Sequence, residues 1–174
     1  MDLFKDNSFT TKKIDKGTIL LSKGGFCKYA YLVIKGCLIS YVMDNASKEH
    51  IIQFAPEEWI ISDMDSFINN KPTCVFIKAI EDTEVILLDK IAFNNFETLS
   101  KNLIIEQSHK LIRNNISMNR RLISLLSYNA EEKYKDFLET YPTLFQRLPL
   151  KLIASYIGVT PEYLSEVRRK IANK

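Results

Sequence analysis

The side chains with the clearest capacity to bind another molecule gather near the C-terminal end of the chain, between residues 148 and 171. Their hydroxyl and carboxylate oxygens can bond to base edges, and their ammonium and guanidinium groups can bond to phosphate oxygens. The residues that helical spacing leaves on the outer side are Thr160, Glu162, Tyr163, Ser165, Glu166, Arg169 and Lys170. This mixture of groups is suited to the major groove of double-stranded DNA.

Two short helices joined by a tight turn are predicted to position these groups. Leu150, Ile153 and Ile157 recur at helical spacing, and the pattern ends at Gly158, which accepts a left-handed backbone without a Cβ penalty. Thr160 is a suitable N-cap for the second helix. A helix-turn-helix needs a small residue where the helices cross, a glycine in the turn and an apolar residue in the second helix, and Ala154, Gly158 and Leu164 meet these needs. The residues predicted to be buried between the two helices are Ile153, Ile157, Val159, Leu164 and Val167. An ordinary helical hairpin packed for stability is the alternative.

The distribution of charge points to the same end of the chain. Residues 1–100 carry 11 Lys/Arg and 14 Asp/Glu, whereas residues 145–174 carry 6 and 2. The net charge is therefore −3 in the first segment and +4 in the last. A basic C-terminal end favours contact with a polyanion, although a gradient of this size is also found on ordinary solvated surfaces.

A long helix is predicted at residues 101–126, which contain neither proline nor glycine. Apolar positions recur along it in alternating steps of four and three, the spacing of a coiled-coil seam. The predicted dimer-interface residues are Ile112, Ile116, Asn119, Ile123 and Leu126. Asn119 favours pairing, because one polar residue on such a seam can fix register and partner number. A monomeric helix lying on a sheet is the alternative.

A further helical segment follows at residues 127–141, with Asn129 as its predicted cap and Pro142 at its end. Its apolar face comprises Ala130, Tyr134, Phe137, Leu138 and Tyr141. We place a domain boundary near residues 126–129, where the long helix gives way to a compact helical domain. Tyr134 and Phe137 are expected in the core of that domain.

The first ninety residues show short β-rich runs separated by turn residues, which predicts an antiparallel β-roll. The candidate strands are residues 18–21, 29–34, 37–43, 50–54, 75–80 and 84–88. Lys35 and Gly36 stand between two of these runs and predict a hairpin there. Phe54, Trp59 and Phe67 are expected in the core, with lining of a ligand cavity as the alternative.

Neither cysteine pattern nor hydropathy indicates a metal centre or a membrane segment. Cys27, Cys37 and Cys74 are widely spaced, odd in number and without a neighbouring histidine, so we expect small core residues in a reducing compartment. The N-terminal residues lack the basic region and apolar run of a signal peptide, and no apolar stretch approaches the roughly 20 residues of a membrane span. We expect a soluble cytoplasmic protein.

A β-roll, a long pairing helix and a terminal helix-turn-helix, in this order, resemble the Crp/Fnr family of bacterial transcription regulators. The motifs that carry the resemblance are NAEEKYKDFLETYP (129–142) and LPLKLIASYIGVTPEYLSEVRRKI (148–171), which are similar to Bacteroidetes-type members, and VIKGCLISYV (33–42) and AIEDTEVILLD (79–89). The resemblance implies an α+β fold with a cyclic-nucleotide-binding-like jelly roll (1–100), a dimerisation helix (101–127) and a winged-helix-like helix-turn-helix domain (128–174). Because the chain stops soon after Ile171, we expect any wing to be missing or very short.

The resemblance also locates an effector cassette, in which family members that bind cyclic nucleotides use a Gly-Glu pair and an arginine with a small neighbour. The matching residues here are Ser62, Asp63, Met64, Thr73 and Cys74. Ser62 and Asp63 replace Gly-Glu, Thr73 and Cys74 replace the arginine and its neighbour, and no arginine precedes Arg113. Without a bidentate cation the site loses its main preference for phosphate. We expect this chain to bind neither a cofactor nor a cyclic nucleotide. Binding of another small-molecule effector is left as an alternative.

On the C-terminal segment the resemblance implies that Pro161, Glu162 and Glu166 face the bases, with Thr160, Tyr163 and Ser165 beside them. Glu166 stands where the family often has arginine, which puts a guanine contact in doubt. The residues expected to contact phosphate are Lys151, Arg168, Arg169 and Lys170. The expected partners are a palindromic DNA duplex and a second copy of the chain, with RNA polymerase as a further candidate.

No catalytic constellation competes with this interpretation, because the sequence contains neither a phosphate-cradling glycine loop nor an HExxH motif. We therefore expect a protein that is not an enzyme. One alternative is a small-molecule-binding sensor module that acts through protein contacts. The other is a cupin-like enzyme, which needs clustered metal ligands, whereas His50 and His109 fall on different predicted elements.

Overall fold

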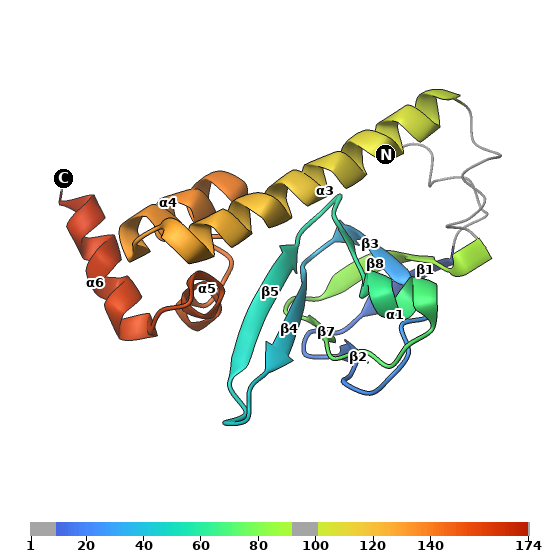
Figure 1. Ribbon diagram of the computed structural model, residues 1–174, viewed down its shortest axis with the longest axis horizontal. Helices are drawn as coiled ribbons and strands as arrows, with labels where there is room; N and C mark the ends of the chain where they lie inside the picture. Colours follow the sequence, from blue (N-terminus) through green and yellow to red (C-terminus); the bar gives the residue numbers. More distant parts are fainter. Residues whose placement is uncertain (1–9, 92–100, 174) are drawn as a thin grey trace. The chain divides into compact units, whose positions relative to one another are not determined.

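The structure is a computed structural model that describes residues 10–91 and 101–173 (Figure 1). The chain divides into two compact units, residues 1–97 and 98–174, and each unit is described by itself. The first unit is a β-roll with a short helix, and the second contains the long helix and three shorter helices. None of the described helices has the length and apolar composition needed to cross a lipid bilayer.

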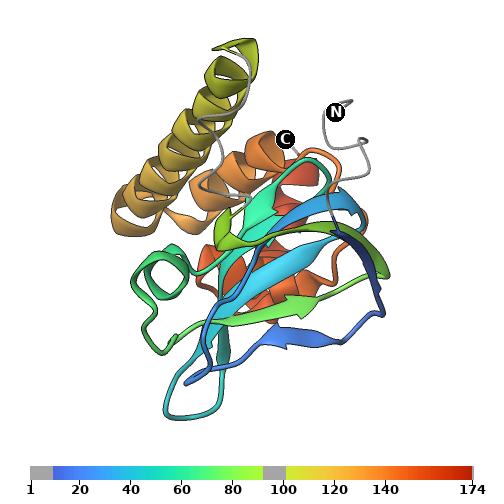
Figure 2. The same cartoon turned by 90° about the vertical axis from the view of Figure 1, so that its right-hand side faces the viewer.

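The roll consists of two antiparallel sheets. Their strands are β1 (Thr10–Ile14), β2 (Ile19–Leu21), β3 (Ala30–Lys35), β4 (Leu38–Met43), β5 (Glu49–Ala55), β6 (Ile60–Ile61), β7 (Phe76–Ala79) and β8 (Thr83–Leu88). One sheet has the order β1-β8-β3-β6 and the other the order β2-β7-β4-β5. The first and last strands pair directly, so the two ends of the described β-rich segment lie side by side (Figure 2). Helix α1 (Met64–Asn69) follows β6.

The main core of the roll forms from the apolar side chains that alternate along these strands. Its fully buried members include Val33, Leu38, Ala55, Ile61, Phe67, Ile77 and Val85. Phe54 and Phe67 are buried as predicted, whereas Trp59 is partly buried and packs against this core. Six strands lie where the sequence predicted them, and β1 and β6 were not predicted.

The predicted hairpin at Lys35 and Gly36 is wrong. The strands on either side belong to different sheets, since β3 pairs with β6 and β8 while β4 pairs with β5 and β7. Gly36 has a φ of 90°, and a Cβ there would lie 2.5 Å from the carbonyl oxygen of Asp82. The turn at Gly36 therefore connects a strand of one sheet to a strand of the other. Its backbone lies so close to the β7–β8 connection that only glycine fits there.

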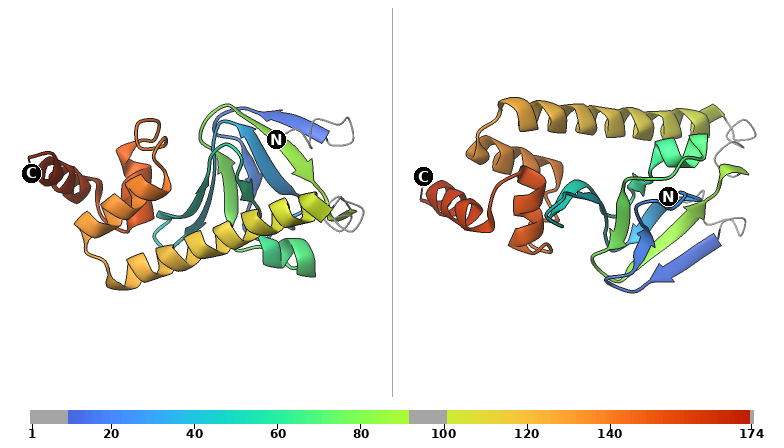
Figure 3. Two further views of the ribbon diagram at one scale, coloured as in Figure 1. Left: turned by 90° about the horizontal axis from the view of Figure 1, so that it is seen from above. Right: turned by 60° about the horizontal axis from the view of Figure 1, so that its bottom comes forward.

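The helical unit begins with α3 (Lys101–Ser127), the single long helix that the sequence predicted. It continues into α4 (Ala130–Thr140), α5 (Leu150–Ile157) and α6 (Pro161–Ala172), as Figure 3 shows. Asn129 caps α4 as predicted: its side chain accepts from the backbone N–H groups of Glu131 and Glu132, and Glu132 accepts from the backbone of Asn129. This reciprocal capping box fixes where α4 begins.

The core of the helical unit is formed by the three shorter helices and the segment between α4 and α5. Its buried side chains include Tyr134, Phe137, Tyr141, Leu144, Leu148, Ile153, Tyr156, Leu164 and Val167. Tyr134 and Phe137 thus lie in a helical core, as expected. The structure groups the long helix with these helices, so the separate dimerisation segment at 101–127 stays a functional prediction.

Candidate nucleic-acid interface and effector cassette

The turn between α5 and α6 has the local geometry that its residues dictate. Gly158 ends α5 with φ 83° and ψ 34°, and its backbone N–H donates to the carbonyl of Ala154 at 2.9 Å. The Thr160 hydroxyl accepts from the backbone N–H of Tyr163 at 3.2 Å, and Pro161 occupies the first turn of α6. These two signals end one helix and start the next within a few residues.

The inner side of this helical pair is buried as the spacing predicted. Ile153, Ile157, Leu164 and Val167 are buried, and Val159 is half-buried. Both helices also contact α4. The packing on α4 fixes which side of α6 stays exposed.

The predicted contact residues lie on α6 and at its N-cap Thr160, except Lys151, which lies on α5. All are exposed except the half-buried Pro161: Lys151, Thr160, Glu162, Tyr163, Ser165, Glu166, Arg168, Arg169 and Lys170. The Ser165 hydroxyl donates to the carbonyl of Pro161 at 3.0 Å, so its proton is already used within the helix. Glu162 lies in the first turn and Arg169 and Lys170 in the last turn, so acceptors precede cations along one helix.

The predicted seam of α3 is exposed in the single chain. The exposed fractions are 55% for Ile112, 49% for Ile116, 54% for Ile123 and 79% for Leu126. Asn119, also exposed, donates from its amide to the side-chain oxygen of Asn115 at 2.9 Å. Four large apolar side chains in one row leave a surface that a second helix can cover.

In the roll, the structure brings Asp63 and Thr73 together. The Asp63 carboxylate caps α1 by accepting from the backbone N–H of Ser66 at 3.3 Å, and it also accepts a hydrogen bond from the Thr73 hydroxyl. Thr73 is buried and its backbone bonds to Gly24 and Gly25 at 2.7 and 2.8 Å. The carboxylate that could have received a ligand hydroxyl is therefore engaged by the chain itself.

The other predicted cassette residues are not joined to this pair. The Ser62 hydroxyl lies 3.3 Å from the Cys27 sulfur and 3.4 Å from the carbonyl of Tyr29. Met64 and Cys74 are exposed. The expectation of a core residue is therefore wrong for Cys74, whereas Cys27 and Cys37 are buried. The residue that sequence reasoning missed is Ser66: it is buried, its hydroxyl accepts from the backbone of Cys27 at 2.9 Å, and it donates to the carbonyl of Lys71 at 2.6 Å.

The Tyr31 side chain on β3 is buried in the roll. Burial, with smaller contributions from Cys27 and Tyr29, raises the pKa of the Tyr31 phenol from 10.0 to about 12. A phenol with this pKa stays neutral across the physiological range. The Tyr31 phenol therefore adds no charge to the interior of the roll.

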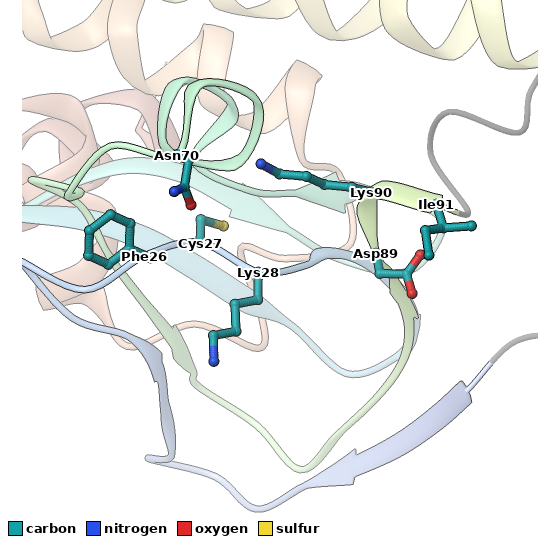
Figure 4. A pocket seen from close by; sticks show the side chains of 7 residues that line it. All are labelled: Phe26, Cys27, Lys28, Asn70, Asp89, Lys90 and Ile91. Atoms are coloured by element: carbon teal, nitrogen blue, oxygen red, sulfur yellow. The ribbon is translucent and has the colours of Figure 1, made fainter.

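A pocket of about 580 Å³ opens beside the start of β3, at a place that the sequence did not indicate. Figure 4 shows its lining residues, Phe26, Cys27, Lys28, Asn70, Asp89, Lys90 and Ile91. The Lys90 ammonium lies 3.5 Å from the carbonyl of Ile68 in α1. Neither Asp63 nor Thr73 lines this pocket, but Cys27 does, and its sulfur contacts Ser62, so the pocket adjoins the matched cassette.

Two four-stranded antiparallel sheets, with a short helix inserted after β6, define a small jelly-roll domain. Residues 11–97 match the family model described as the cyclic nucleotide-binding domain. This match spans half of the chain, and the chain belongs to that family. A search of curated proteins finds no match.

Solved structures share the fold over nearly the whole chain. FixK2 from Bradyrhizobium japonicum is 16% identical, with a TM-score of 0.76 over 95% of this chain and 85% of that one. The c-di-GMP responsive global regulator CLP of Xanthomonas campestris is 13% identical, with a TM-score of 0.72 over 95% and 87%. A CRP/FNR-family transcriptional regulator from Thermus thermophilus is 15% identical, with a TM-score of 0.72 over 94% and 86%. The structural neighbours thus include regulators of the CRP/FNR family, and the likeness concerns the fold.

Proposed function

We propose that this chain is a homodimeric, sequence-specific DNA-binding regulator of the Crp/Fnr type, of the form found in Bacteroidetes-type bacteria, acting in the cytoplasm. The observation that carries the proposal is the α5–α6 pair. Its inner side is buried, while its outer side exposes the carboxylates, hydroxyls and cations of α6. That combination is what a helix-turn-helix needs to place its second helix in a major groove.

In this proposal α6 is the recognition helix. Glu162 and Glu166 accept from base amino groups, and cytosine N4 is the donor best suited to a carboxylate. The phosphate contacts come from Lys151, Arg168, Arg169 and Lys170, which orient the helix without selecting a sequence. In this proposal, the specificity for a DNA sequence depends on the two glutamate carboxylates, and the affinity for DNA depends on the lysine and arginine side chains.

Two copies would pair along the exposed seam of α3. The partner helix would cover Ile112, Ile116, Ile123 and Leu126, and the Asn119 side chains would fix the register. Each protomer then contributes one recognition helix, and the two reach major-groove faces about 34 Å apart on a palindromic site. Two-fold symmetry of the protein would thus match two-fold symmetry of the operator.

We further propose that the roll does not respond to cyclic nucleotides. The Asp63 carboxylate already accepts from Ser66 and Thr73, and no arginine precedes Arg113 to bind a phosphate. A cyclic dinucleotide of the kind to which CLP responds carries two phosphates and needs cations that this cassette does not offer. Calorimetric titration with cyclic AMP, cyclic GMP and cyclic di-GMP is expected to give no heat of binding at micromolar concentrations.

A random-duplex selection tests the DNA-binding proposal directly. The full chain is immobilised and a pool of randomised double-stranded oligonucleotides is passed over it at about 0.1 M salt. We expect enrichment of a palindrome whose half-site centres lie about one helical turn apart, with affinity that falls steeply as salt rises. A pool that stays random would overturn the proposal and favour the alternative of a sensor that acts through protein contacts.

A further inference from the structure

Arg121 on α3 makes a contact that the proposed function does not use. Its guanidinium carbon lies 3.4 Å from the centre of the Tyr156 ring on α5. Arg121 is half-buried, and Tyr156 is 6% exposed. A guanidinium stacked at this distance on a buried ring makes a cation–π contact with little competition from water.

The ring that Arg121 covers is itself fixed in place. The Tyr156 ring meets the rings of Phe137 and Tyr141 edge-on, with both centroid distances 5.7 Å. The Phe137 and Tyr141 rings are 5.5 Å apart, and both residues are buried. This aromatic cluster, Phe137, Tyr141 and Tyr156, joins α4, its C-terminal end and α5 into one packed body.

Charged groups on α3 and α4 lie near the contact between Arg121 and the aromatic cluster. Burial and the nearby Glu139 carboxylate raise the pKa of the Asp136 carboxyl on α4, and Arg120, a hydrogen bond from Ser124 and Arg121 partly oppose that rise. The Arg121 guanidinium thus lies on the Tyr156 ring while its charge acts on Asp136. These interactions with both α4 and α5 restrict the orientation of this side chain on α3.

We propose that Arg121 is a positioning residue that sets the angle between the long helix α3 and the α5–α6 pair. The inference rests on the proposed function. Because α6 starts only a few residues after α5 ends, the direction of the recognition helix follows that of α5. When two copies pair along α3, that angle decides how far apart the two recognition helices lie. Arg121 would therefore select the spacing between operator half-sites.

The test measures spacing preference rather than affinity alone. The selected palindrome is rebuilt with its half-sites one or two base pairs closer or farther apart, and the affinity of each duplex is measured by fluorescence anisotropy. We expect the wild-type chain to prefer its own spacing by about tenfold or more, and Arg121→Ala to narrow that preference to about twofold. A residue that only supported the fold would weaken binding to all spacings alike.

Matched variants separate the stacking contact from charge and from stability. Arg120→Ala removes the same charge from the neighbouring exposed position, and Tyr156→Phe keeps the ring; both should retain the wild-type preference. Arg121→Gln keeps most of the stem, so it replaces Arg121→Ala if the alanine variant unfolds. Equal spacing preference in the Arg121 variants and Arg120→Ala would overturn this inference alone. If the wild-type chain retained no duplex, both this inference and the proposed function would be overturned.

Discussion

The effector cassette of the roll and the outer side of α6 contain similar kinds of side chain but use them in opposite ways. Around the cassette, Asp63, Ser66 and Thr73 bond to one another and to the backbone. On α6, Glu162, Glu166 and the cations of the last turns are exposed. Polar groups that are already bonded and buried hold a structure together, whereas exposed ones are available to a partner. This contrast supports the proposal that the chain binds its partner through the helical unit.

The largest expected effect concerns the exposed seam of α3. Like the outer side of α6, this seam is exposed and can contact a partner. Ile116→Glu places a carboxylate in the proposed dimer interface, where two copies would bury two like charges. We expect the dimer dissociation constant to rise about a hundredfold or more, measured by light scattering over a concentration series.

Met118→Glu is the matched control for the seam. Met118 is 44% exposed and lies on another side of α3, so the same new charge should leave the dimer intact. A dimer of unchanged stability in Ile116→Glu would remove the seam from the proposed interface.

A second prediction concerns the burial of the Tyr31 phenol in the roll. Because folding raises the Tyr31 pKa from 10.0 to about 12, the unfolded chain binds fewer protons than the folded chain between these values. The free energy of unfolding should therefore fall as pH rises from about 10 to about 12, by about 2 to 3 kcal/mol in total. Denaturant unfolding at several pH values measures this fall.

Tyr31→Phe provides the comparison for that pH dependence, since it removes the ionisable group and keeps the ring. The variant should lose the component of the fall that begins near pH 10. The same pH dependence in wild type and variant would show that the Tyr31 phenol is not held neutral by burial.

A smaller effect is expected from opening the cassette itself. Thr73→Val keeps the shape of the side chain and removes the hydroxyl that donates to Asp63 and accepts from the backbone N–H of Val75 at 2.9 Å. The carboxylate then loses a partner in a partly buried site, which should lower the free energy of unfolding by about 1 to 3 kcal/mol. Thr11→Val, at an exposed position on β1, should change it by less than about 0.5 kcal/mol. Equal stability of the two variants would mean that the Asp63–Thr73 bond does not hold the cassette.

The features that the sequence predicted correctly depend on neighbours along the chain. The Asn129 cap, the turn at Gly158, the Thr160 cap and the buried seam of α5 and α6 all follow from spacings of a few residues. The long helix follows from the absence of proline and glycine over residues 101–126. Local rules of capping and periodicity were sufficient for these elements.

The features that were missed depend on residues far apart in the sequence. The turn at Gly36 looks like a hairpin locally, but the pairing of β3 with β8 and of β4 with β5 and β7 separates the two strands. Ser66 bonds to Cys27 across 39 positions, and Arg121 reaches Tyr156 on another helix. β1 has an exposed, polar sequence and β6 has two residues, so neither shows the alternation that marks a strand. Tertiary pairing, rather than local propensity, decides these positions.

Binding of DNA by α6 is best tested with two double charge reversals, Arg169→Glu/Lys170→Glu on α6 and Lys12→Glu/Lys13→Glu on β1. Both change the charge equally at adjacent exposed positions, so they differ in location rather than in net charge. Fluorescence anisotropy with the selected duplex should show about a hundredfold loss of affinity for the α6 variant and little change for the β1 variant. Equal affinities for the two variants would contradict the assignment of DNA binding to α6.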